Sequence, residues 1–236
     1  MNSEVKALTF YEPVAIIAPG ATFLMVLYFI STHPTMYELS RIVDKFDTSA
    51  LSIAALAILA YVVGQLLRSI SYLVVERGTR KVFGNITNRF LFGRSKQFHW
   101  PRCFLNVFFS SYFEPLDPST RVRLTKVFTD KNLSPEEDIY SCESWLFGPG
   151  IEGTKRDPAT SSQLIEFQRL YGFHSSMMVI DLIWVMMRIF LLNEDIFSVL
   201  DCALVIFAVI HFYQFLWAYR RASITVAINV ISHPPL

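Results

Sequence analysis

Seven polar or ionisable side chains interrupt long apolar runs of this sequence, and they are the residues best placed to do chemistry. They are Gln65, Arg68, Asp181, Arg188, Asp201, His211 and Gln214. A charge inside a bilayer costs about 2.5–3.5 kcal/mol on insertion scales, so such residues usually line a polar pathway, relay ions or pair with one another. The pattern therefore predicts either an intramembrane pathway or structural pairing between helices.

Two of the seven, Arg188 and Asp201, form what we call the outer pair. At about 1.5 Å per helical residue, both fall in the outer half of the bilayer. Asp181 and Arg188 are seven residues apart and share one helix face, which we expect to point away from lipid. Arg188 and Asp201 are expected at matching depth on either side of a short turn at 193–195, where their charges would neutralise each other. We expect an ion pair that locks two helices together.

The other five residues form the inner polar layer, in the half of the bilayer nearest the cytoplasm. They are Gln65, Arg68, Asp181, His211 and Gln214. Two interpretations stay open for this layer. It lines a polar pathway or gate, or it is structural, with Arg68 reaching to the headgroups and the two glutamines bonding between helices.

The sequence contains no motif for nucleophilic catalysis, metal binding or thiol chemistry. There is no serine nucleophile elbow, no HExxH motif and no CxxC spacing, and the three cysteines lie far apart. The glycine-rich segment 148–155 departs from a phosphate-binding P-loop, because Thr154 precedes Lys155 and Pro158 interrupts a following helix. We expect that segment to be a flexible connector, and we expect no metal, no cofactor and no enzymatic activity.

The composition indicates a membrane protein. Of 236 residues, 53% are hydrophobic and only 17% are charged, and the mean hydropathy is +0.38. That leaves too little polar surface to coat a soluble globule. The net charge of +1 also provides no general basic field, so nucleic acid is not an expected partner.

Four apolar runs have about the length needed to cross a bilayer. They are residues 14–30, 49–75, 172–192 and 196–219. Basic residues collect on the cytoplasmic side of membranes. Five of them follow the second and fourth runs directly: Arg77, Arg80, Lys81, Arg220 and Arg221. We therefore expect an inner-membrane protein with both termini and the long middle segment in the cytoplasm.

The middle segment, residues 76–160, is predicted to be a mostly helical insert. Helix starts are predicted at Asp117-Pro118, at Ser134-Pro135 and at the capping box from Thr160 to Gln163. From the last of these, no helix breaker appears before Asn193, so one helix of roughly 30 residues should begin in the cytoplasm and become the third span. An aromatic and basic stretch at 89–113 suits the bilayer interface better than single-stranded nucleic acid.

These signals predict an all-α integral membrane protein with four transmembrane helices and a cytoplasmic insert between spans two and three. Residues 1–75 carry the first two spans, and residues 76–160 form the insert. Residues 161–236 form the long helix that becomes span three, followed by span four and a cytoplasmic tail. A single four-helix bundle is too narrow for a wide channel, so any pore requires several copies.

Three segments carry a resemblance to a known group of proteins. They are AYVVGQLL at 60–67 with Glu76 and Arg77, EFQRLYGFHS at 166–175, and YRRA at 219–222. Together they resemble a loose group of small bacterial four-span membrane proteins often encoded in anti-phage defence loci. Members of that group often have His where this chain has Gln65, and Arg where it has Ser175.

The resemblance implies an antiviral membrane effector that senses a cytoplasmic signal or partner and then perturbs or permeabilises the inner membrane. Its partners would be the lipid bilayer, further copies of itself and a cytoplasmic protein encoded nearby. Two alternatives stay open. An ion channel or small transporter would use the inner polar layer for a defined solute, and a scaffold would recruit a cytoplasmic partner through the insert.

Overall fold

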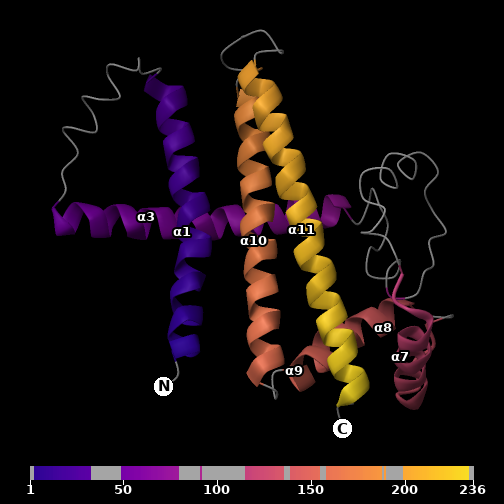
Figure 1. Ribbon diagram of the computed structural model, residues 1–236. Helices are drawn as coiled ribbons and strands as arrows, with labels where there is room; N and C mark the ends of the chain where they lie inside the picture. Colours follow the sequence, from indigo (N-terminus) through magenta and orange to yellow (C-terminus); the bar gives the residue numbers. More distant parts are fainter. Residues whose placement is uncertain are drawn as a thin grey trace. The chain divides into compact units, whose positions relative to one another are not determined.

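The computed structural model describes residues 3–32, 49–79, 91, 115–135, 139–154, 158–187, 189 and 199–233. Every regular element within these residues is a helix, as Figure 1 shows. The all-α prediction is therefore confirmed. The aromatic and basic stretch at 89–113 falls outside the described residues except for Leu91. Ser134 and Pro135 are described and are not helical, residues 136–138 are outside the described part, and helix is found from Ile139 onward.

Three helical stretches in the described residues are long and apolar enough to cross a membrane: Ala50–Thr79, Ala159–Met187 and Cys202–Ser232. They correspond to α3 (Ala50–Ser71) with the turns that follow it, to α10 (Pro158–Met187) and to α11 (Val199–Ser232). The first predicted run lies in α1 (Ser3–Thr32), whose described apolar part, Pro13–Tyr28, is shorter. The structure thus contains three of the expected spans as candidates.

Large apolar side chains are exposed along α3 and α11. Leu51 is 82% exposed and Ile58 is 66% exposed on α3, and Ile206 is 59% exposed on α11. Soluble monomeric proteins rarely expose apolar faces of this extent to water. Lipid tails or neighbouring copies are the environments that suit them.

The chain divides into two compact units: residues 1–75 with 172–212, and residues 76–171 with 213–236. In the first unit, α1 and α3 cross where glycines allow their backbones to touch. A Cβ atom added at Gly20 would lie 1.8 Å from the carbonyl oxygen of Ala60, and one at Gly64 would lie 2.0 Å from that of Ile16. Only glycine fits at either position.

In the second unit, α7 (Pro118–Asp130) begins where the sequence predicts. The Asp117 carboxylate caps the helix by accepting hydrogen bonds from the backbone amides of Ser119 and Thr120. Hydrogen bonds led by the one from the Thr120 hydroxyl hold the pKa of Asp117 well below its usual range. The helix is anchored by the fully buried Phe128, whose ring meets Trp145 edge to face at 5.7 Å.

Two wide π turns are complete within the described residues, and both interrupt helices. One, η1 (Tyr72–Glu76), follows α3 directly, and the other, η3 (Leu146–Gly150), joins α8 (Ile139–Trp145) to α9 (Ile151–Thr154). Pro149 lies inside η3 and lacks the backbone N–H that a regular α-helix would use. The prediction of a flexible connector is therefore wrong up to Thr154, because the glycines there are accommodated in helical turns.

The helix α11 continues well past the predicted end of the fourth run at Tyr219 and reaches Ser232. The residues treated as a tail in the sequence thus form between three and four further turns, in which Val226, Ala227 and Val230 are buried. Arg220 and Arg221 do not end the helix. The Arg221 guanidinium lies 5.6 Å from the centre of the Trp217 ring, one turn earlier.

Candidate functional site

A pair of histidines joins α10 to α11 in the first unit. The Nδ1 atoms of His174 and His211 are 3.0 Å apart, which is hydrogen-bonding distance. One ring must donate and the other accept, so the pair shares a proton between two nitrogen atoms. Both rings also contact Phe173, at centroid distances of 5.1 and 6.4 Å.

His211 belongs to the predicted inner polar layer, whereas no role was predicted for His174. A signal for the pair was available. His174 lies 19 residues before Asn193 and His211 lies 18 residues after it, and antiparallel helices joined by a short turn pair residues at equal distances from that turn. The ring contact between Phe167 and Trp217, in the second unit, follows the same rule.

Asp181 lies seven residues beyond His174 on α10 and therefore on nearly the same face, about 10 Å further along the helix. It is buried, with 7% of its surface exposed. Its Oδ2 atom has no hydrogen-bond partner among the residues that the structure describes. A buried carboxylate oxygen without a partner is costly, and such groups are usually retained for a function.

Arg68 and a pair of serines mark the contact between α3 and α10. The Arg68 guanidinium packs over Gly172, where an added Cβ would lie 3.1 Å from its Nε atom. The hydroxyl oxygens of Ser71 and Ser175 are 3.1 Å apart and buried. Ser175 stands where members of the resembling group often have arginine. In this protein it forms a hydrogen bond between α3 and α10.

The remaining predicted residues lie apart from this cluster or outside the described side chains. Gln65 donates from its Nε2 atom to the Tyr61 hydroxyl on its own helix, at 3.0 Å. Gln214 is half-buried and belongs to the second unit. Arg188 and the side chain of Asp201 fall outside the described part of the chain, so the outer ion pair stays a prediction.

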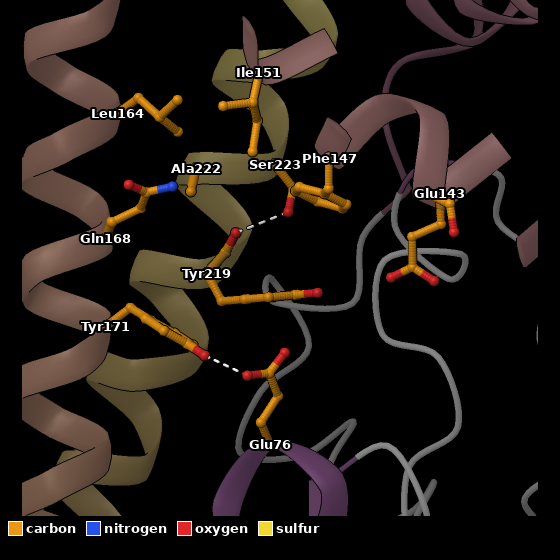
Figure 2. Close-up of a pocket in the computed structure, with 11 residues that line it drawn as sticks. Glu76, Glu143, Phe147, Ile151, Leu164, Gln168, Tyr171, Tyr219, Ala222 and Ser223 are labelled. Atoms are coloured by element: carbon orange, nitrogen blue, oxygen red, sulfur yellow. Dashed lines mark hydrogen bonds between the residues drawn. The ribbon is translucent and has the colours of Figure 1, made fainter. Parts of the chain in front are cut away.

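A cavity of about 390 Å³ opens in the second unit (Figure 2). Its walls come from η1, α8, η3, α9, α10 and α11, and they combine acidic, aromatic and small side chains. The lining residues are Glu76, Glu143, Ser144, Phe147, Ile151, Leu164, Gln168, Tyr171, Tyr219, Ala222 and Ser223. None of these residues is among the candidate site residues predicted from the sequence.

The acidic part of the cavity consists of Glu76 and Glu143, both more than nine-tenths buried. The Tyr171 hydroxyl donates a hydrogen bond to Oε2 of Glu76, as drawn in Figure 2. The aromatic part consists of three neighbouring rings. Phe147 stacks on Tyr219 with ring centres 6.3 Å apart, and the tilted rings of Tyr219 and Tyr171 have centres 5.9 Å apart. Carboxylates beside ring faces make a site suited to a positively charged group.

No family model, curated protein or solved structure matches this chain. Function must therefore be inferred from the two sites themselves. Within the described residues, no three His, Cys, Asp or Glu side chains lie close enough to hold a metal ion. The described residues provide proton sharing at the histidine pair, a buried carboxylate within a candidate span, and a cavity lined by carboxylates and aromatic rings.

Proposed function

We propose that the protein is a non-enzymatic inner-membrane effector, with four spans, that lets ions leak across the bilayer when a cytoplasmic signal or partner engages it. The resemblance to proteins of anti-phage defence loci suggests the setting. The observation that carries the proposal is the row of polar side chains on α10, in which the half-buried His174 shares a proton with His211 and the buried Asp181 lies two turns further along. Both positions fall within candidate spans.

The polar row formed by His174, His211 and Asp181 suits a pathway for protons or small cations better than one for large solutes. Each imidazole has two ring nitrogens, one donor and one acceptor, so a hydrogen-bonded pair can accept a proton on one side and release it on the other. A carboxylate further along the same face offers the next acceptor. A wider opening requires several copies, and the exposed apolar faces of α3 and α11 are the surfaces on which copies or lipid would pack.

The topology is the first part to test, with α1 as the remaining span and both termini and the insert in the cytoplasm. A reporter that is active only in the periplasm should show activity when fused after Asp195. It should show none when fused at Lys131 or at the C-terminus, because basic residues flank the inner ends of the spans. Activity at Lys131 would overturn the orientation.

The leak itself is tested by expressing the protein with its neighbouring genes and challenging the cells with phage. We expect triggered wild-type cells to lose membrane potential. Asp181→Asn should slow that loss about tenfold, which corresponds to about 1.4 kcal/mol on the barrier, because the asparagine cannot bind a proton. Glu166→Gln, a change of the same chemistry at an exposed position of α10, should leave the rate unchanged.

The same measurement separates the alternatives. Triggered wild-type cells that keep full potential and exclude a membrane-impermeant dye would rule out the effector and favour a scaffold. A selective, saturable ion flux without damage to the cell would favour a channel or transporter.

A further inference from the structure

The two histidine rings that join α10 to α11 face each other directly. The Nδ1 atoms of His174 and His211 are 3.0 Å apart, and the centres of the two rings are 5.3 Å apart. The second distance equals the first plus about one ring radius on each side, so both nitrogens lie close to the line between the ring centres. Each Nδ1 atom therefore points at the other ring, which is the alignment that a hydrogen bond prefers.

The space between these two nitrogens fits a proton and is too small for a metal cation. Even a small ion bound by imidazole lies about 2.0–2.1 Å from each nitrogen, so an ion on the line between them needs a gap of about 4 Å. The observed gap is 3.0 Å. Potassium ions in selective channels are held by oxygen atoms that replace their hydration shell, and an imidazole nitrogen is a poor substitute for such oxygens. The geometry of the pair thus favours protons over alkali cations.

An apolar ring beside the pair adds to this selectivity. Phe173 meets both imidazoles nearly at right angles, with interplanar angles of 80° to His174 and 74° to His211. Both imidazoles are half-buried. The phenyl ring occupies space next to the two nitrogens that a hydrated cation would need, and it offers that cation no oxygen ligand. A hydrogen bond can cross this point without any such space.

The pair can pass a proton along by a change of tautomers. In the neutral pair one ring donates from Nδ1 and has an acceptor at Nε2, while the other ring accepts at Nδ1 and carries its proton on Nε2. A proton that binds Nε2 of the first ring releases the Nδ1 proton to the second ring, which then loses its own Nε2 proton. One proton enters, one leaves, and the hydrogen bond now runs in the opposite direction. The rings must turn over before the next transfer, so protons cross one at a time.

We propose that the leak is selective for protons, and that the hydrogen bond between His174 and His211 is the point at which protons are separated from other cations. Proton selectivity rests on the proposed leak, since it names the ion that the leak carries. The passage lies between two helices of one chain, so it needs no wide opening between copies. Triggered cells should therefore lose their potential and acidify while still excluding a membrane-impermeant dye, and the loss of potential is itself the damage.

The test repeats the phage challenge in two media that are both more acidic than the cytoplasm. One contains sodium, and in the other the large organic cation N-methylglucamine replaces it. A potential-sensitive dye reports depolarisation, and a pH-sensitive fluorescent protein reports cytoplasmic pH. We expect depolarisation at the same rate in both media, accompanied by acidification. Depolarisation that requires sodium, or that proceeds without acidification, would overturn proton selectivity and leave the leak established. A full potential in both media would refute the leak itself.

Two variants locate the selectivity at the histidine pair. In His174→Gln the amide can still hydrogen-bond His211, but it does not take up and release a proton, so triggered acidification should slow by about tenfold or more, or about 1.4 kcal/mol on the barrier. His233→Gln is the matched control, because His233 is exposed and lies just past the end of α11, and it should acidify as fast as wild type. Equal rates in the two variants would contradict the proposal. If His174→Gln does not reach the membrane, the wild-type comparison of the two media decides the outcome by itself.

Discussion

Replacing Gly64 with alanine should separate α1 from α3 and destabilise the first unit severely. The added methyl group would lie 2.0 Å from the carbonyl oxygen of Ile16, and that oxygen belongs to backbone that cannot rotate away as a side chain can. Overpacking by side chains costs about 1–3 kcal/mol, and a collision with backbone should reach or exceed the upper end of that range. Thermal unfolding in detergent and protease sensitivity of the first unit measure the effect.

Two other glycines make this prediction specific. Gly20→Ala should be equally damaging, because its methyl group would lie 1.8 Å from the carbonyl oxygen of Ala60. Gly78→Ala is the matched control, since nothing lies within 4 Å of the methyl group it would add. Alanine is also the better helix former, so Gly78→Ala should be neutral or slightly stabilising. A Gly64→Ala protein as stable as Gly78→Ala would show that the helices do not cross at this point.

The second large effect is expected from breaking α10. Prolines at positions 167 and 170 would remove backbone donors from the middle of a 30-residue helix, at a cost of about 3 kcal/mol or more each. If α10 carries the signal from the insert into the membrane, triggered depolarisation should be lost. The amount of protein in the membrane should stay the same, because the apolar runs remain intact.

The control for this experiment must account for the side chains that the prolines replace. Phe167 meets Trp217 at 5.9 Å, so its loss alone could loosen α10 from α11. The double change Phe167→Ala with Leu170→Ala removes the same side chains but keeps the helix. Depolarisation that persists in the proline variant, or that is lost equally in the alanine variant, would contradict transmission through an unbroken helix.

Local signals in the sequence were enough to predict much of the helical structure. Asp117 followed by Pro118 correctly marks the start of α7, since a short acidic side chain and a missing N–H both suit the first turn. The third start was placed too late, at the capping box from Thr160, although α10 already begins at Pro158. The end of α11 was placed too early, because Arg220 and Arg221 look like a boundary although no glycine or proline follows before Pro234.

The candidate sites were harder to predict because they depend on contacts between distant residues. Asp181 and His211 could be chosen for their polarity, but the pairing of His211 with His174 requires the register of two antiparallel helices. Predicting the cavity from the sequence would require contacts between residues that are still further apart. Glu76 and Tyr171 are 95 residues apart in sequence and meet through a hydrogen bond, and no local pattern indicates that η1 and η3 depart from α-helical geometry.

The π turn after α3 also gives this stretch some freedom in length. A π turn holds more residues than an α-helical turn of the same path, so deleting one residue within Tyr72–Glu76 would restore α-helical geometry. The residues that follow the deletion would then keep nearly the same rotation relative to α3. A deletion within the regular helix Ala50–Ser71 would instead rotate the residues after it by about 100°. Natural variation in residue number should therefore be tolerated at Tyr72–Glu76 and not within α3.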